Sequence, residues 1–294
     1  MIYTLTLSPS LDYLLDTPEI KFGETNRSKS ESLHFGGKGI NVSYVLKQLD
    51  TPCVCLGFVA GFTGRELEAM LKKEGLSTDF VEVKKGNTRI NVKIKSDKIT
   101  EINANSPEIS QKDMEELFTK LDKLCMGDTI VLAGSTPKGW DNAYSMIMER
   151  LSVKDVKFVV DTSGKKLLDC LKYKPFLIKP NKSELEEILG ISAFNDEQIV
   201  AAAKKLQTLG AESVLVSMGE NGALLVDENG KVHRENAIRI TPVSTVGAGD
   251  SMVAGFLAGI DRGYDYALGL GNACGAATAS CEILADKERI YSLM

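Results

Sequence analysis

Near its carboxyl end the chain places one carboxylate directly after three small residues. Gly247, Ala248 and Gly249 precede Asp250, and a strongly apolar stretch follows. Small residues let another molecule approach the backbone, and the unpaired N–H groups at a helix start attract an anion. An aspartate beside such an anion site can take a proton from a hydroxyl group while the amides hold the developing negative charge. The segment therefore predicts either a general-base site or an ordinary helix with an acidic first turn.

A second glycine-rich segment lies near the amino end and opens the first long helical pattern. Residues 36–41 read Gly-Gly-Lys-Gly-Ile-Asn. Gly37 permits close backbone approach, Lys38 supplies a positive charge, and Asn41 offers a donor and an acceptor. This combination favours a site for a polar or anionic small molecule, and a glycine-rich turn with a solvated lysine is the alternative. The sequence contains no phosphate-loop, dinucleotide-binding or protein-kinase motif.

Two shorter segments follow apolar stretches that are typical of strands. Asn181 and Glu184 have the spacing of a helix-capping pair, although Glu184 could instead organise a magnesium ion on nucleotide phosphates. Residues 217–222 read Ser-Met-Gly-Glu-Asn-Gly and join two apolar runs. They predict either a hairpin turn or a contact with a nucleotide.

The composition limits what the chain can bind. Its 294 residues are 43% hydrophobic and 26% charged, with a formal net charge of −5. This balance argues against nucleic acid as a partner, so an anionic substrate must be held by a local group of cations. Only two histidines are present, His34 and His233, which excludes a multi-histidine metal site. Both are interpreted as surface or packing residues, and general-base chemistry therefore falls to a carboxylate.

The sequence also predicts a cytoplasmic location. Six cysteines occur without a Cys-x-x-Cys pair, which favours reduced thiols. The amino end lacks the basic start of a signal peptide. Because no apolar run is long enough to cross a membrane, we expect no membrane contact.

Strand-like and helix-like patterns alternate along most of the chain. Alternation of this kind predicts an α/β fold in which helices cover both faces of a mainly parallel sheet. Ligands in such folds bind at the carboxyl ends of the strands. The expected strands are residues 1–7, 53–59, 129–133, 157–161, 176–179 and 213–217, and the expected helices are residues 40–49, 65–74, 111–123, 142–151, 165–171, 182–189 and 196–209.

Two segments depart from this alternation. Residues 11–35 are polar and rich in turns, and residues 88–103 read as a hairpin. Each alternates polar and apolar residues, which is typical of strands with one solvated face. We expect the two segments to pair into a small β-sheet lid over the site. Because so small a sheet is marginal in water, it is expected to pack on a second copy in a homodimer. The core is expected to comprise residues 1–10, 36–87 and 104–294.

Taken together, these motifs match a known family in order and position. The chain resembles the PfkB family of ribokinase-like sugar kinases over nearly its whole length. The resemblance implies a three-layer α/β core with a β-sheet lid, and transfer of a phosphoryl group from ATP with Mg²⁺. It is carried by residues 9–13, 36–43, 57–64, 88–94, 100–103, 132–135, 179–184, 217–222 and 246–255.

The resemblance also implies a role for individual residues. The general base would be Asp250, and the anion hole would be formed by the amides of Gly247, Ala248 and Gly249. The sugar would contact Asp12, Gly37, Lys38 and Asn41, and its existing phosphate would contact Arg27, Arg89 and Ser135, with Asn91 and Asn103 also on the lid. The magnesium ion would be served by Glu184, and the nucleotide would contact Lys179, Asn181, Ser217, Gly219, Gly222, Gly249 and Asn272.

The implied reaction is phosphorylation of fructose 1-phosphate by ATP to give fructose 1,6-bisphosphate. Tagatose 6-phosphate is an alternative acceptor, since a ketofuranose is nearly symmetric end for end. A regulator that binds sugar phosphate without catalysis is a more distant alternative, and the intact Asp250 argues against it. Two positions depart from the family's pattern: Ser244 stands where many members carry aspartate, and Ser8 stands where asparagine is usual. The second departure concerns only the geometry of a local turn.

Overall fold

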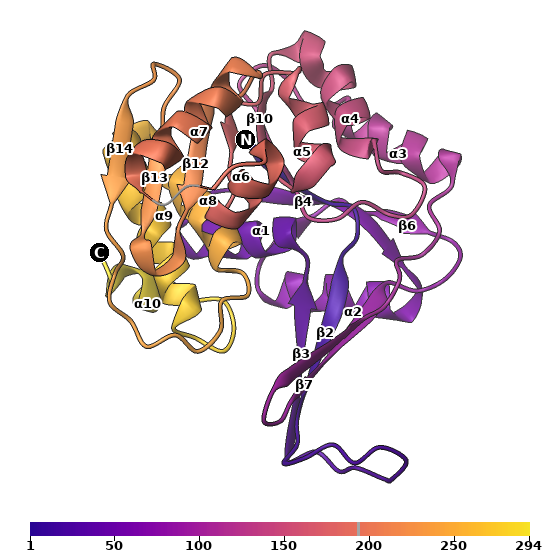
Figure 1. Ribbon diagram of the computed structural model, residues 1–294. Coiled ribbons are helices and arrows are strands. Elements are labelled where there is room, and N and C mark those ends of the chain that lie inside the picture. Colours follow the sequence, from indigo (N-terminus) through magenta and orange to yellow (C-terminus); the bar gives the residue numbers. More distant parts are fainter. Residues whose placement is uncertain (193–194) are drawn as a thin grey trace.

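The described part of the chain contains a large sheet of ten strands, with helices on both faces (Figure 1). The computed structural model describes residues 1–192 and 195–294. The strands of the large sheet are β1 (Ile2–Thr6), β4 (Cys53–Ala60), β5 (Ser77–Thr78), β6 (Val81–Val83), β9 (Thr129–Ala133), β10 (Lys157–Asp161), β11 (Leu177–Ile178), β12 (Ser213–Ser217), β13 (Ala223–Val226) and β14 (Val232–Glu235). Their order is β14-β13-β12-β11-β10-β9-β1-β4-β5, and β6 also pairs with β4. All neighbouring strands run parallel except β12–β13 and β13–β14.

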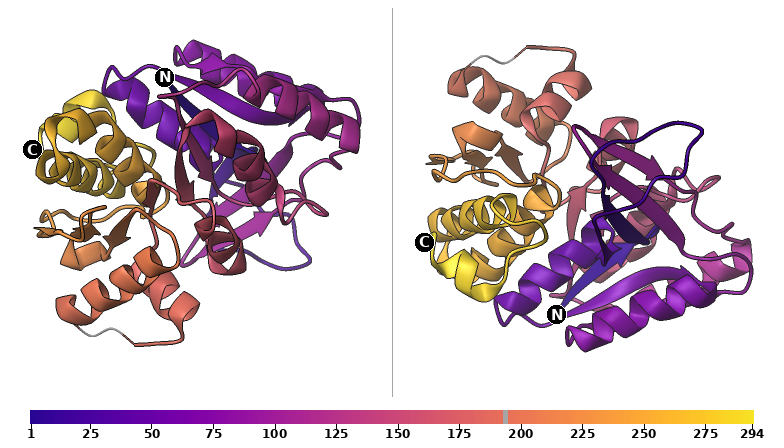
Figure 2. Two further views of the ribbon diagram at one scale, coloured as in Figure 1. Left: turned by 90° about the horizontal axis from the view of Figure 1, so that it is seen from above. Right: turned by 90° about the horizontal axis from the view of Figure 1, so that it is seen from below.

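The helices form a layer on each face of this sheet (Figure 2). One face is covered by α1 (Lys38–Gln48), α8 (Ala248–Gly259), α9 (Tyr264–Ala279) and α10 (Lys287–Tyr291). The other face is covered by α3 (Gln111–Leu121), α4 (Ala143–Leu151), α5 (Gly164–Leu171), α6 (Lys182–Leu189) and α7 (Asp196–Thr208). Because both faces are buried, central strands such as β9 are apolar along almost their whole length. The predicted three-layer α/β fold is confirmed.

Most predicted elements are confirmed within a few residues of their expected ends, and α2 (Gly61–Lys73) shows the largest shift. This helix begins at Gly61, whereas the pattern predicted a start at Arg65. Gly61 adopts φ +62°, where a side chain would collide with Asn87. The start of this helix is therefore determined by the backbone conformation that Gly61 allows, and not by the spacing of apolar residues. Leu67 and Leu71 then pack the helix against β4 and α1.

The two segments that broke the alternation pair into one separate sheet. It contains β2 (Ser10–Asp16), β3 (Ser30–Gly36), β7 (Arg89–Lys95) and β8 (Ile99–Asn103), in the order β3-β2-β7-β8. The pairs β2–β3 and β7–β8 are antiparallel, whereas β2 and β7 run parallel. We call this the small sheet, and it projects from the body of the molecule (Figure 1). The expected pairing of the two segments is confirmed.

The register of the small sheet sorts its side chains onto two faces. Asp12 lies between His34 of β3 and Asn91 of β7, and Asn103 of β8 continues this row. The next row on the same face contains Lys93. Because side chains alternate along a strand, the intervening residues lie on the opposite face. The polar row faces the cavity described below.

The opposite face of the small sheet is apolar and exposed. Leu33, Ile90 and Ile102 lie on it, each more than a third exposed, and Phe62 of α2 lies beside Leu33 and Ile90 along a shallow groove. The connection from β2 to β3 extends away from the body (Figure 1) and carries Phe22, whose side chain is 96% exposed. These apolar groups form a surface that a monomer leaves in contact with water.

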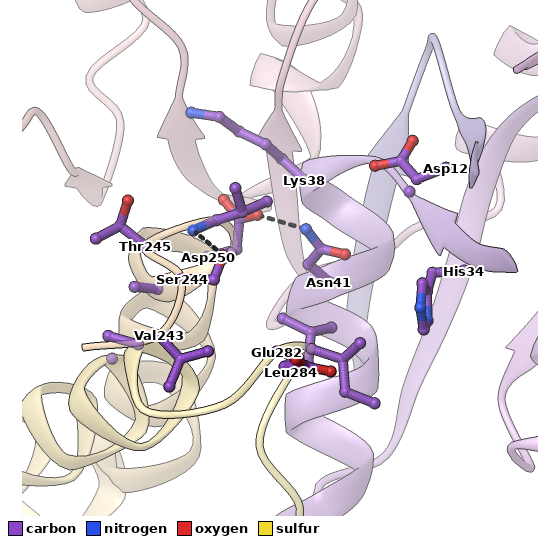
Figure 3. Close-up of a pocket in the computed structure, with 18 of the residues that line it drawn as sticks. Asp12, His34, Lys38, Asn41, Val243, Ser244, Thr245, Asp250, Glu282 and Leu284 are labelled. Atoms are coloured by element: carbon purple, nitrogen blue, oxygen red, sulfur yellow. Dashed lines mark hydrogen bonds between the residues drawn. The ribbon is translucent and has the colours of Figure 1, made fainter. Parts of the chain in front are cut away.

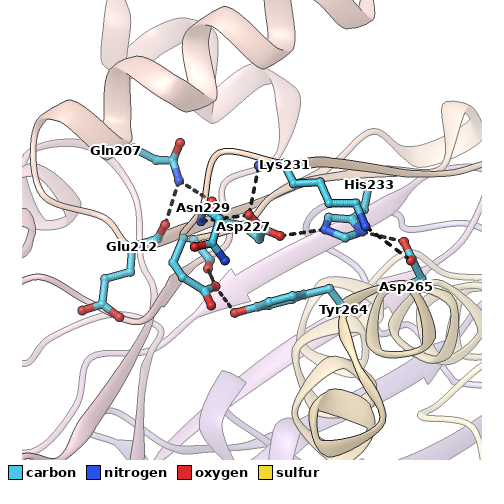
Figure 4. Close-up of polar contacts among 10 residues, drawn as sticks. Gln207, Glu212, Asp227, Asn229, Lys231, His233, Tyr264 and Asp265 are labelled. Atoms are coloured by element: carbon cyan, nitrogen blue, oxygen red, sulfur yellow. Dashed lines mark hydrogen bonds and ion pairs between the residues drawn. The ribbon is translucent and has the colours of Figure 1, made fainter.

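The second histidine ties the antiparallel edge of the large sheet to α9 (Figure 4). His233 of β14 is buried, and its Nε2 lies 2.9 Å from Asp227 Oδ2 while its Nδ1 lies 2.5 Å from Asp265 Oδ1. Tyr264 at the start of α9 also donates a hydrogen bond to Glu228. The interpretation of His233 as a packing residue is confirmed, whereas His34 lies at the cavity. In the described ranges no helix is long and apolar enough to span a membrane.

Candidate active site

A cavity of about 1830 Å³ lies between the small sheet, the starts of α1 and α8, and the carboxyl ends of central strands (Figure 3). This is the location expected for a ligand in a parallel α/β sheet. It collects almost every residue predicted from the sequence: Asp12, Gly37, Lys38, Asn41, Arg89, Asn91, Ser135, Lys179, Asn181, Glu184, Ser217, Gly219, Gly222, Gly247, Ala248, Gly249, Asp250 and Asn272. Residues distant in sequence therefore meet in one site.

Asp250 lies in the first turn of α8 and is only 6% exposed. The helix begins after Gly247, whose φ of +78° lies in the left-handed region that glycine adopts without strain. Asn41 Nδ2 donates a hydrogen bond of 2.8 Å to Asp250 Oδ2 (Figure 3). Burial and the negative charge of Asp161 raise the pKa of Asp250 to about 6, although Lys38 and the Asn41 bond oppose the change. Such a carboxylate can accept a proton near neutral pH.

A buried carboxylate holds two lysines beside Asp250. Asp161 ends β10 and is 1% exposed, and its Oδ1 lies 3.2 Å from Lys38 Nζ and 3.5 Å from Lys179 Nζ. Burial alone would raise the pKa of Asp161, but the two cations outweigh burial and lower it. Burial likewise opposes the charge on Lys38, but Asp161 and Asp250 raise the pKa of this lysine. The group places two positive charges next to the candidate base.

Asp161 is a site residue that the sequence reasoning missed. The signal was present, because Asp161 is the last residue of a predicted strand, and the carboxyl ends of such strands line the ligand site. Its side chain was overlooked because no glycine-rich motif surrounds it. Lys38 and Lys179, the lysines that it binds, were both predicted.

The start of α8 leaves room for a lysine and an anion. A Cβ atom on Gly249 would lie 3.0 Å from Lys179 Nζ, so the bare glycine admits the ammonium group. The Ala248 N–H donates to the carbonyl oxygen of Thr245 at 3.3 Å. The predicted role of the Ala248 amide in an anion hole stays a prediction. The amide of Gly249, in the first turn, has no acceptor inside the helix.

The small sheet supplies a polar wall centred on Asp12. Its Oδ1 accepts hydrogen bonds from Ser10 Oγ at 2.7 Å and Asn91 Nδ2 at 2.9 Å, and its Oδ2 lies 3.0 Å from Lys93 Nζ. A Cβ atom on Gly36 would lie 2.6 Å from Asp12 Oδ1, so only glycine fits there. Neither Ser10 nor Lys93 was predicted to belong to the site. The Lys93 contact was not predicted because alternation does not specify which strands are neighbours, whereas Ser10 lies two residues before Asp12 on the same strand and so on the same face.

Polar atoms without a hydrogen-bond partner lie in or beside this site. Among the described residues, three buried side-chain atoms lack a hydrogen-bond partner: Arg89 Nε, Asn91 Oδ1 and Asp161 Oδ2. The Nη2 of Arg89 donates a hydrogen bond of 3.0 Å to the carbonyl oxygen of Ser8. Buried polar groups without partners are rare and costly. Arg89 and Asn91 line the cavity, and one donor and one acceptor there fit a ligand with both phosphate and hydroxyl groups.

Two predicted residues lie outside the cavity lining. Arg27 is exposed in the connection between β2 and β3. Asn103 is exposed on β8, at the far edge of the row that contains Asp12. The structure therefore gives no support for a contact between either residue and the sugar phosphate within one chain. Ser135, the third residue predicted for the phosphate together with Arg27 and Arg89, does line the cavity.

The glycines predicted for the nucleotide have different structural roles. Gly219 has φ +55°, and a Cβ atom there would meet no other atom within 4 Å, so this position is open to the cavity. Gly222 has φ +84°, and a Cβ atom there would lie 2.1 Å from the carbonyl oxygen of Glu235. Asn272 Nδ2 donates to the carbonyl oxygen of Asn236 at 2.8 Å and so anchors the segment that follows Asn236. Much of that segment, which was not predicted, lines the same side of the cavity.

The sequence matches the pfkB family carbohydrate kinase over residues 7–287. The chain belongs to this family. The match covers the small sheet and every strand of the large sheet except β1, and it includes all of the predicted cavity residues named above. The predicted membership in the PfkB family is confirmed.

Relatives within and near the family agree with this assignment. A 1-phosphofructokinase from Bacillus subtilis is 44% identical, with 100% of this chain and 97% of that protein covered. A D-tagatose-1-phosphate kinase from Bacillus licheniformis is 37% identical, with 99% and 96% covered. Phosphofructokinase-2 from Escherichia coli, solved in complex with substrates and products, has a TM-score of 0.92 at 26% identity, with 99% and 97% covered.

In this PfkB kinase Glu184 performs the capping role that the sequence left open. Its backbone N–H donates to Asn181 Oδ1, and its Oε2 accepts from the Asn181 N–H, both at 2.8 Å. The pair starts α6 as a capping box. Glu184 nevertheless lines the cavity, so its second carboxylate oxygen remains available there.

The buried charge group yields a test of stability. We expect Asp161→Asn to lower the free energy of unfolding by about 3 kcal/mol, because Lys38 and Lys179 lose their common counter-charge. Urea denaturation at neutral pH measures this change. The matched control is Asp122→Asn, which removes an exposed ion pair with Arg150 and should cost less than about 1 kcal/mol. Equal losses for the two variants would contradict the assignment of Asp161 as the central counter-ion.

Proposed function

We propose that this PfkB kinase transfers the terminal phosphoryl group of ATP to the primary hydroxyl at C6 of fructose 1-phosphate. The products are ADP and fructose 1,6-bisphosphate. The observation that carries the proposal is Asp250, a buried carboxylate with a pKa near 6, beside Lys38 and Lys179. The 44% identity to a 1-phosphofructokinase over the whole chain supports the choice of acceptor.

The proposed chemistry uses the base and the two cations together. Asp250 takes the proton of the sugar hydroxyl as its oxygen forms a bond to the terminal phosphorus, and the bond from that phosphorus to the bridging oxygen of ADP breaks. Lys38, Lys179 and the first-turn amide of Gly249 offset the negative charge on the transferred group. Phosphoryl transfer depends on such positioning and charge balance more than on covalent catalysis.

The donor set suits a magnesium ion that arrives on the nucleotide. Across residues 1–192 and 195–294, no group of three or more His, Cys, Asp or Glu side chains is placed to hold a metal ion. Mg²⁺ keeps most of its waters and usually takes only one or two carboxylates besides phosphate oxygens. Glu184, with one free oxygen, and Asp161 Oδ2, buried without a partner, are oxygens of the right kind. When bound, the ion would neutralise charge on the phosphates.

The proposed location follows from the substrates and the thiols. All six cysteines are free, as expected of a protein in a reducing compartment. Sugar phosphates and ATP are charged metabolites of the cell interior. We therefore place the proposed enzyme in the cytoplasm.

Acceptor specificity tests the proposed function directly. ADP release should be measured with fructose 1-phosphate, tagatose 1-phosphate, fructose 6-phosphate and tagatose 6-phosphate. We expect kcat/KM for fructose 1-phosphate to exceed the others by about tenfold or more, since each differs in a hydroxyl or in phosphate position. The similarity to a D-tagatose-1-phosphate kinase makes tagatose 1-phosphate the second candidate. A clear preference for either 6-phosphate, or no turnover of any acceptor, would refute the proposal.

The pKa of Asp250 predicts a pH profile. Because the base must be ionised, kcat/KM should fall about tenfold per pH unit below about pH 6. Asp250→Asn should lower kcat by about 10²–10⁴-fold or more.

The raised pKa of Asp250 also predicts how stability depends on pH. Folding favours the protonated carboxyl, so its stabilising effect is lost as pH rises through about 6. At pH 8 the variant should therefore unfold at no lower temperature than the wild type.

A control separates this effect from a general loss of charge. Asp261→Asn removes an exposed carboxylate from the short turn that follows α8 and should leave both the rate and the profile unchanged. If Asp250→Asn retained more than about a tenth of the wild-type rate, Asp250 would not be the base.

The exposed apolar face of the small sheet supports a homodimer through this sheet. Sedimentation velocity at micromolar concentration should give a dimer for the wild type, since burying this face removes apolar surface from water. We expect Ile102→Asp to produce monomers, because Ile102 lies on that face. Val153→Asp, at an exposed apolar position away from the small sheet, should remain dimeric. A monomeric wild type would exclude the proposed assembly.

A further inference from the structure

The small sheet carries an ion pair inside the cavity that no step of the proposed chemistry uses. Lys93 Nζ lies 3.0 Å from Asp12 Oδ2, and the two side chains are only 16% and 15% exposed. Both line the cavity from neighbouring strands. By contrast, the next lysine on the same face, Lys95, pairs at 3.7 Å with the exposed Glu282. The Lys93–Asp12 pair is therefore withdrawn from solvent at the wall that faces the acceptor.

The proposed acceptor creates a charge problem at this wall. A sugar phosphate is dianionic near neutral pH, and the ionised Asp12 adds a further negative charge to the same cavity. The carboxylate is nevertheless useful, because only an acceptor can take hydrogen bonds from sugar hydroxyls. Lys93 balances the negative charge of Asp12. The carboxylate can still accept hydrogen bonds, because one ammonium group leaves lone pairs on Asp12 Oδ2.

The same pair also orients a second acceptor. The Nδ2 of Asn91 donates a hydrogen bond to Asp12 Oδ1, whereas the Oδ1 of Asn91 is buried without a partner. The direction of the Asn91 amide thus depends on where Asp12 is held. With Lys93 on one oxygen and Ser10 and Asn91 on the other, the carboxylate has one defined position. Two acceptor atoms are then fixed side by side toward the cavity.

His34 and Arg89 are further basic groups near Asp12, and neither forms an ion pair with it in the described part of the chain. His34 is the cross-strand neighbour of Asp12, and its Nε2 lies 2.9 Å from Ser32 Oγ. Burial lowers the pKa of His34; the charge of Asp12 opposes this effect and that of Lys93 adds to it. The imidazole is therefore mostly neutral near pH 7. Burial lowers the pKa of Arg89 and the charge of Asp12 opposes this effect, but the Nη2 of Arg89 donates to the carbonyl oxygen of Ser8.

We propose that Lys93 is a positioning residue that balances the charge of Asp12 and fixes it as an acceptor for hydroxyl groups of a phosphorylated sugar. The inference rests on the proposed function and adds a determinant of specificity to it. Lys93 acts through Asp12 and does not bind the phosphate itself. Lys93 thereby lets Asp12 accept hydrogen bonds from sugar hydroxyls although the substrate already carries two negative charges.

A double-mutant cycle tests this inference with fructose 1-phosphate as the acceptor. Lys93→Met should raise KM for fructose 1-phosphate about tenfold or more, because it leaves a withdrawn carboxylate without its partner. KM for ATP should change less than about twofold, and kcat should change much less than KM for the sugar. Lys93→Arg should recover most of the loss, since it restores the cation. Lys98→Met, in the exposed turn between β7 and β8, serves as the charge-matched control.

The decisive measurement is Lys93→Met in an Asp12→Asn background. If Lys93 acts through Asp12, its removal there should change KM for the sugar by less than about threefold, because no carboxylate remains to balance. Additive effects would mean that Lys93 contacts the substrate independently, and would overturn the inference. A Lys93→Met enzyme with wild-type KM would overturn it as well. An active wild type with an additive cycle refutes only this inference, whereas a wild type inactive on every ketohexose phosphate refutes the proposed function and the inference with it.

Discussion

The active site depends on one buried carboxylate that holds two lysines next to another carboxylate. Asp161 compensates Lys38 and Lys179, and its charge also contributes to the high pKa of Asp250. A base and two cations in such proximity would otherwise neutralise one another by forming a direct ion pair. Asp161 pairs with both lysines and Asn41 donates a hydrogen bond to Asp250, so the proposed base is not drawn into an ion pair with either lysine. The arrangement requires strand β10 and the starts of α1 and α8 to meet at one point, which the three-layer fold provides.

The two sheets divide the work of the site between them. The large sheet and its helices supply the groups proposed to act on the transferred phosphoryl group, and both faces of this sheet are buried. The small sheet supplies Asp12, Asn91 and Arg89, which line the cavity where the acceptor is proposed to bind. Its other face is apolar and exposed. The surface proposed for assembly and the surface proposed for sugar recognition are thus opposite sides of the same four strands.

Local sequence patterns predicted the fold and much of the site, for identifiable reasons. Glycine-rich segments before a helical pattern are visible in the sequence, so Lys38 and Asp250 were predicted to belong to the site. The end of a strand has no such motif, and Asp161 was overlooked although its strand was predicted correctly. The two polar segments were expected to pair, but alternation does not specify which of their strands are neighbours or in which register. The contact of Lys93 with Asp12 follows from that pairing, as does the position of Asn103 at the outer edge of the row.

The parallel pairing of β2 with β7 has a consequence for the order in which the chain acquires its structure. The Asn91–Asp12 hydrogen bond joins residues 79 positions apart, and α1, β4 and α2 lie between them. Parallel strands cannot be joined by a tight turn, and closing so long a loop costs entropy before any pairing compensates for it. Contacts of high sequence separation form slowly for this reason. The wall proposed to face the sugar therefore cannot be complete until the chain has been synthesised through β7 and the two distant strands have paired.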